Sequence, residues 1–234
     1  MAATAVVDLL RRGALTVKGR LPAASNATLL VEVELDGATT LGVYKPHRGE
    51  RPLWDFPSGL FRRELAAWHL SEALGWGLVP LTVARTEGPY GEGSLQLFVP
   101  ADFEQHYFTL REDPGHHDRL RRICAFDLIA NNADRKSGHC LLAEDGTIYA
   151  IDNALCFHVE PKLRTVIWDF ADEPLPPPIA EDLRRLVAHA TSPALRELIE
   201  ADECRALLRR ARALLKAGRF PTDTIGRGYP WPLV

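Results

Sequence analysis

Two aspartates in the second half of the chain have the placement of a metal-dependent phosphate site. Asp134 lies in a polar loop after the apolar run CAFDLIA, and Asp152 follows the apolar run IYAI. The turn signal Asp145-Gly146 lies between them, so both carboxylates are expected near the open end of one hairpin. One carboxylate could take a proton from an attacking hydroxyl while the other holds Mg²⁺ or Mn²⁺ against nucleotide phosphates. The alternative is a pair of turn-forming aspartates that cap the hairpin.

Two charged residues of the first half complete a possible site. Lys45 ends a predicted strand in the run GVYKP, and Glu64 lies on the helix predicted next, in RRELAAWHL. The ammonium could contact phosphate as a point charge, with the carboxylate holding it in place as an ion pair. Taken alone, each residue is better explained as a solvated surface charge. The order Lys45, Glu64, Asp134, Asp152 favours a functional set.

The elements that must position these residues change in character along the chain. Period-2 patterns predict strands over 14–19, 28–37, 39–46, 78–88 and 93–100, and a hairpin over 140–152. Amphipathic patterns predict helices over 2–12, 58–74, 116–131, 179–190 and 193–217. A strand-rich half before a helix-rich half predicts an α+β fold of two lobes, residues 1–99 and 100–234, with a ligand site between them. The aromatic residues Trp54 and Phe56 are expected to pack in the core or between the lobes.

Composition excludes several classes of protein. The 28 Lys and Arg residues against 31 Asp and Glu give a net charge of −3, which argues against a nucleic-acid partner. No apolar run approaches the roughly 18 residues of a membrane span, so no integral membrane association is expected. The four cysteines form no CxxC pair, which favours a reducing compartment and a cytoplasmic location.

Four motifs together resemble the kinase-like fold. The chain is similar to phosphatidylinositol 3-/4-kinases, to the type II phosphatidylinositol 4-kinases most, and to a group of actinobacterial proteins of phosphatidylinositol-kinase-like type. GVYKP resembles the ATP-lysine strand of those kinases, GSLQLFV their hinge strand, NADR their catalytic loop and IDNALCF their metal motif. The motifs span residues 42–157, about half of the chain.

The resemblance implies a nucleotide site. Lys45 would contact the ATP phosphates and Glu64 would pair with it. Backbone groups of Phe98 and Val99 would contact adenine. The phosphate-covering loop would fall on LPAASNATLL, with contacts from Ser25, Asn26 and Thr28, although this loop has no glycine between Gly19 and Gly37.

The resemblance also implies a catalytic and metal site. Asp134 would be the catalytic-loop aspartate, with Arg135 beside it, and Asp152 the principal ligand of Mg²⁺ or Mn²⁺. Five residues after Asp134, where kinases carry a metal-binding Asn, this chain has His139. That histidine is interpreted either as a metal ligand, which suits Mn²⁺ better than Mg²⁺, or as a structural residue.

The function implied is ATP- and metal-dependent transfer of a phosphoryl group to a hydroxyl acceptor, which could be a lipid, a protein or a small metabolite. Three alternatives stay open: a nucleotide-binding pseudokinase with a regulatory role, an AMP-transferring enzyme of the same fold, and a structural protein whose aspartates only form turns. Acceptor specificity is expected to reside in the loops 101–117 and 153–178.

Overall fold

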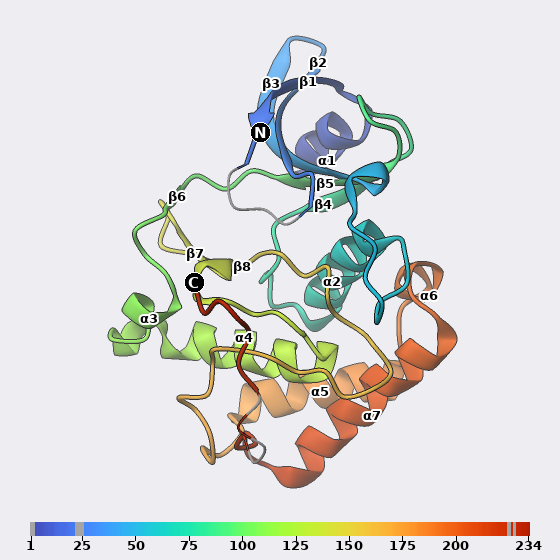
Figure 1. Cartoon of the computed structure of the whole chain (residues 1–234). Helices are drawn as coiled ribbons and strands as arrows, with labels where there is room; N and C mark the ends of the chain where they lie inside the picture. The colour runs from blue at the N-terminus through green and yellow to red at the C-terminus, as the bar shows by residue number, and fades with distance from the viewer. Residues whose placement is uncertain (1–2, 22–25, 224–225, 227) are drawn as a thin grey trace.

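The chain folds into a sheet-rich part and a helix-rich part, as the sequence predicts. The computed structural model describes residues 3–21, 26–223, 226 and 228–234. Figure 1 shows the larger sheet and α1 (Ala3–Arg12) at one end and the long helices at the other. The strands are β1 (Ala14–Arg20), β2 (Leu29–Leu35), β3 (Ala38–Pro46), β4 (Thr82–Arg85), β5 (Gly93–Leu97), β6 (Ala101–Asp102), β7 (Cys140–Ala143) and β8 (Ile148–Ala150). The other α-helices are α2 (Leu60–Leu74), α3 (Tyr107–Leu110), α4 (His117–Ala130), α5 (Pro177–His189), α6 (Pro193–Leu198) and α7 (Ala201–Ala217).

The first sheet is antiparallel, with strand order β1-β2-β3-β5-β4. The β2–β3 hairpin turns at Asp36 and Gly37, which have φ values of 52° and 80°. Both positive values suit the tight turn that the sequence predicts at Asp-Gly. The alternation along β2 buries Val31 and Val33, which pack with Leu10 of α1 into a small core beneath the sheet.

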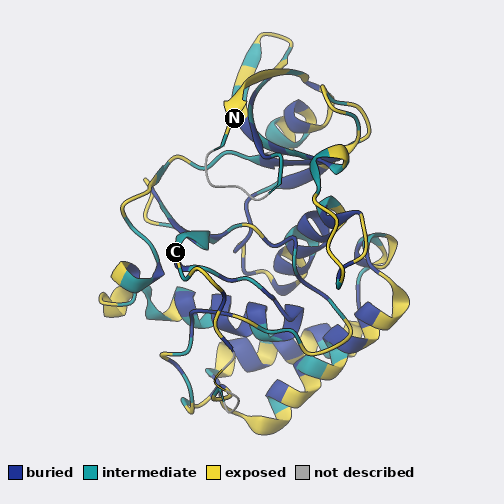
Figure 2. Cartoon of the chain, in the orientation of Figure 1, coloured by how far each residue is buried: buried dark blue, intermediate teal, exposed yellow. Residues whose placement is uncertain are grey.

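The helices share a larger core. Figure 2 shows buried residues along the facing sides of α2, α4, α5 and α7. The buried cluster includes Leu70 of α2, Phe126 of α4, Leu183 of α5 and Leu207 of α7. α2 therefore packs its apolar face against the helix-rich part, although it precedes residue 99 in the chain. Within the described residues, no helix is both long enough and apolar enough to cross a membrane.

A second, three-stranded sheet of order β6-β7-β8 joins the two parts. Its β7–β8 hairpin is the one predicted over 140–152, and it turns at Asp145 and Gly146. The hairpin carries Asp152 just beyond its second strand, while Asp134 precedes its first. The fold thus brings both acidic loops to the open end of one hairpin.

Two predictions about individual segments are wrong. The helix predicted over 193–217 is divided into α6 and α7, because Ile199 and Glu200 are extended and Glu200 starts α7 with a capping box to Glu203. The sequence predicts that Trp54 packs in the core or between the lobes, but the residue is 95% exposed, with the Lys162 ammonium 5.6 Å from its ring centroid.

Candidate active site

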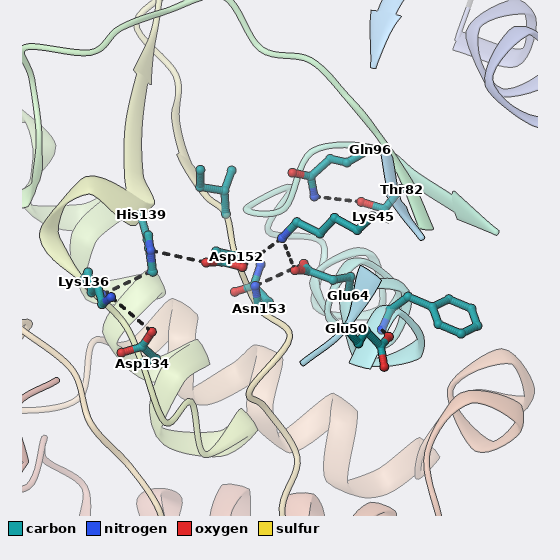
Figure 3. A network of polar contacts seen from close by, with 12 residues as sticks. Lys45, Glu50, Glu64, Thr82, Gln96, Asp134, Lys136, His139, Asp152 and Asn153 are labelled. Carbon is teal, nitrogen blue, oxygen red and sulfur yellow. Dashed lines mark hydrogen bonds and ion pairs between the residues drawn. The ribbon is translucent and has the colours of Figure 1, made fainter. Parts of the chain in front are cut away.

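Lys45 lies between two carboxylates at the end of β3. Its ammonium donates to Glu64 Oε1 on α2 and, at 2.9 Å, to Asp152 Oδ1 after β8 (Figure 3). The other oxygen of Glu64 accepts the Asn153 backbone N–H at 3.1 Å. Glu64 is 2% exposed, whereas Asp152 has 47% of its side chain open to the cleft. Three of the four residues singled out by their order in the sequence therefore meet in one cluster.

The electrostatics of this cluster favour the charged forms of Lys45 and Asp152. Burial alone would lower the pKa of Lys45, but the charges of Asp152 and Glu64 raise that pKa well above its usual range. The Lys45 ammonium in turn holds the pKa of Asp152 well below its usual range, more than offsetting the effect of burial. Asp152 is therefore a carboxylate at every physiological pH, the form that can hold a hard divalent cation.

A buried arginine fixes α2 so that Glu64 faces the lysine. The neighbouring Arg63 donates to Glu203 of α7 at 2.5 Å and to the Cys156 carbonyl, and its side chain is buried. Gly75, in the left-handed conformation at φ 70°, ends the helix. The position of Glu64 thus depends on the buried contacts of its neighbour Arg63.

Asp134 lies in the loop between α4 and β7. Its backbone N–H donates to Asn132 Oδ1 at 2.9 Å, and Lys136 Nζ lies 3.6 Å from its carboxylate. Burial raises the pKa of Asp134 to about 6, and the charge of Asp152 adds to the rise, while Lys136 and Arg164 oppose it. Sequence reasoning missed Lys136, although its position two residues after Asp134 in a polar loop was a usable signal.

Arg135 points away from the cleft. Its guanidinium is fully buried and forms an ion pair with Asp127 of α4 at 2.9 Å. It also donates to the Ile151 carbonyl and to Asn153 Oδ1, both at 2.6 Å. The side chain therefore joins α4 to the segment that carries Asp152, and the structure does not bring its guanidinium into the cluster around Lys45.

His139 lies beside Asp152. Its Nε2 is 3.5 Å from Asp152 Oδ2, and its Nδ1 accepts the Lys136 backbone N–H at 3.3 Å. Burial lowers the pKa of His139 to about 4, so the imidazole is neutral at pH 7. With Nδ1 accepting, the single proton lies on Nε2 and points toward Asp152. Metal ligation through Nε2 would require the bond from Lys136 to be given up.

A largely apolar cavity of about 340 Å³ opens next to Lys45. Phe98, Val99 and Thr28 line it, together with Lys45 and Asp152. The Phe98 N–H already donates to the Leu41 carbonyl at 3.0 Å, so this sheet bond occupies one of the backbone groups expected to contact a base.

The structure describes only part of the predicted phosphate loop. Ser25 lies outside the described residues. Asn26 and Thr28 line a smaller cavity with Lys45, but Asn26 Oδ1 accepts the Arg51 N–H at 2.9 Å and the Ala27 N–H donates to the Gly49 carbonyl at 3.0 Å. These two contacts tie the loop to the segment after β3.

Two solved structures, one of them of a kinase, share this architecture. The crystal structure of the Golgi casein kinase with Mn/ADP bound has a TM-score of 0.60 at 16% identity, covering 99% of this chain and 80% of that one. The structure of hydra Fam20 with sugar has a TM-score of 0.56 at 17% identity, covering 91% of this chain and 86% of that one. The fold is therefore a two-lobed kinase-like fold of α+β class, as the sequence motifs predict.

The family follows from sequence identity. The chain is 42% identical to Protein Rv2133c of Mycobacterium tuberculosis over 96% of this chain and 94% of that protein, and it belongs to the same family. No family model matches the chain. The comparisons support the kinase-like fold, and the narrower resemblance to phosphatidylinositol kinases remains a hypothesis.

Proposed function

We propose that the protein is an ATP- and divalent-metal-dependent phosphotransferase that acts on a hydroxyl acceptor. The observation that carries the proposal is Lys45, whose ammonium lies between Glu64 and Asp152 at the edge of an apolar cavity of about 340 Å³. A cavity of that size suits a purine, and a cation beside it suits the attached phosphates. The kinase-like neighbour with Mn/ADP bound supports the same ligand class.

The acidic residues fit a metal ion held jointly with a nucleotide. Within the described part of the chain, no group of three or more His, Cys, Asp or Glu side chains could hold a metal by itself. Mg²⁺ in phosphate sites is usually bound by one or two carboxylates, with the substrate phosphates and water completing its shell. Asp152, ionised and half open to the cleft, would supply such a carboxylate. The ion would neutralise charge on the transferring group.

Asp134 is the group best placed to act as base. Its pKa of about 6 lies near neutral pH, where a carboxylate is both ionised and basic enough to accept a hydroxyl proton. Lys136, 3.6 Å away, provides a positive charge beside the position of transfer. The buried side chain of Arg135 joins the segment that carries Asp152 to α4, and Arg135 itself directly follows Asp134. We therefore assign Arg135 a role in positioning both aspartates.

Thermal unfolding in the presence of ATP tests the proposal. ATP with Mn²⁺ or Mg²⁺ at 100 times its Kd stabilises the native state by about 2.7 kcal/mol. For a chain of this length that free energy raises the midpoint by about 5–10 °C. Asp152→Ala removes the metal-dependent shift, whereas Asp134→Ala keeps the shift and loses ADP formation. Asp8→Ala, an exposed aspartate on α1, is the matched control and behaves as wild type.

Three outcomes would overturn this function. If ATP gives no shift with either metal, the chain is not a nucleotide enzyme of this kind. If ATP binds and pyrophosphate appears in place of ADP, the reaction is AMP transfer, and binding without turnover identifies a pseudokinase.

A further inference from the structure

The loop of Asp134 is paired with a segment from the later part of the chain. Arg135 and Thr165 form a parallel β-bridge. The Arg164 N–H donates to the Asn132 carbonyl at 2.9 Å, and its carbonyl accepts the Arg135 N–H at 3.0 Å. These two bonds enclose Ala133 and Asp134, so Asp134, one position before the bridge, lies beside Arg164 of the paired segment.

The side chains of this pair alternate between two faces. Arg135 and Thr165 point inward, and both bond the buried carboxylate of Asp127. Successive residues of an extended pair point to opposite sides, so Asp134 and Arg164 share the outer face. Arg164 is exposed there, and its positive charge is among the influences that lower the pKa of Asp134.

Within the described residues, Arg164 differs from Lys136 and Lys162 in having no ion-pair partner. Lys136 pairs with Asp134, and Lys162 pairs with Asp55 at 3.1 Å. Over the residues that the structure describes, the Arg164 side chain has no hydrogen bond, ion pair or ring contact. An exposed guanidinium beside the base is therefore available to a ligand.

The segment that carries Arg164 is held rigidly. Asn131, in the left-handed conformation at the end of α4, donates to the carbonyls of His158 and Glu160 at 2.9 and 2.6 Å. Its side-chain oxygen accepts the Lys162 N–H at 2.9 Å. Because the backbone is fixed before any acceptor arrives, a contact made by Arg164 costs less ordering entropy than one made from a mobile loop.

We propose that Arg164 binds an anionic group of the acceptor, which is therefore an alcohol carrying a phosphate or carboxylate a few bonds from its reacting hydroxyl. The planar guanidinium matches either anion with two parallel hydrogen bonds. The inference rests on the proposed function and adds the class of acceptor. A free phosphorylated metabolite and a lipid headgroup share this chemistry.

The test uses glycerol 3-phosphate as the soluble probe and glycerol as its neutral counterpart, each added to protein saturated with ADP and Mn²⁺. Vesicles of phosphatidylinositol in phosphatidylcholine, against phosphatidylcholine alone, probe the lipid source. Arg164→Gln weakens binding of the anionic probes about tenfold or more, the range expected for charge-assisted hydrogen bonds. Arg212→Gln, an exposed arginine on α7, is the matched control and binds as wild type.

The ATP-dependent thermal shift distinguishes failure of the proposed phosphotransferase function from failure of the proposed role of Arg164. Arg164→Gln keeps that shift, because its side chain does not line the nucleotide cavity. If ATP produces no thermal shift in the wild-type protein, the proposed phosphotransferase function is refuted. Equal binding of glycerol 3-phosphate by wild type and Arg164→Gln, including no binding by either, would overturn the role of Arg164. ADP formation stimulated only by an acidic serine peptide would overturn the small-alcohol acceptor in favour of a protein.

Discussion

The buried ion pair beneath the cleft gives the sharpest structural prediction. Asp127 and Arg135 are both 0% exposed, and the Asp127 carboxylate accepts from Arg135 Nε and Nη2 at 2.9–3.1 Å. Among the described residues, Arg135→Met leaves that buried carboxylate with two donors, Asn132 Nδ2 at 3.1 Å and Thr165 Oγ1 at 3.3 Å. Removing one partner of a buried pair costs about 3–5 kcal/mol.

Urea unfolding measures this cost. With a slope of about 3 kcal/mol per molar, the expected loss lowers the midpoint by about 1–2 M. The double variant Asp127→Asn with Arg135→Met is less destabilised than the sum of the two single variants, because it leaves no unpaired buried charge. A loss below about 1 kcal/mol in Arg135→Met, together with abolished turnover, would refute this reasoning and return Arg135 to a direct catalytic role.

Two further predictions concern the loops around Asp134. The carboxylate of Asp134 is its basic form, and burial raises the pKa of Asp134 to about 6. We therefore expect kcat for ADP formation to fall as the pH is lowered through about 6 and to be level above pH 7. A constant kcat from pH 5 to 8 contradicts the assignment of Asp134 as the base. The end of the chain supports the same loops, because the Ser137 N–H donates to the Leu233 carbonyl at 2.8 Å and the Thr165 N–H to the Gly228 carbonyl at 2.7 Å. Deleting residues 228–234 leaves two buried N–H groups without acceptors, at about 1–3 kcal/mol each, and hydrogen exchange at these two amides accelerates. Trp231→Ala, whose side chain is 87% exposed, is the control with unchanged exchange.

The order of motifs in the sequence was enough to predict the cluster around Lys45. Strand patterns located Lys45 and Asp152 at strand ends, the helix pattern located Glu64 within a helix, and the resemblance to kinases predicted the pairing of Lys45 with Glu64. The direction of the Arg135 side chain was beyond such reasoning, because it depends on Asp127 and on Thr165, thirty positions later in the chain. A parallel bridge between distant loops leaves no periodic signal in either one.

Short and exposed features were also beyond the reach of the sequence. β6 has two residues, too few to show an alternation. The division between α6 and α7 at Ile199 is likewise local, since the apolar pattern continues through a break of two extended residues. A tryptophan such as Trp54 is usually expected in a core because of its size and apolar character. Its exposure is set by the path of the segment after β3, which the sequence does not reveal.

The placement of α2 explains why the cluster is complete before any ligand binds. Adjacent helix residues point about 100° apart, so Arg63 and Glu64 face different partners, and neither can move without the other. Withdrawing Glu64 from Lys45 by shifting α2 would also break the buried Arg63–Glu203 pair, at about 3–5 kcal/mol. At 1.4 kcal/mol per factor of ten, a displaced helix would be populated at roughly 1% or less. In the proposed phosphotransferase, the nucleotide would therefore meet a lysine already oriented, and among the described residues near Asp134 the side chain of Arg164 would remain without an ion-pair partner for the acceptor to contact.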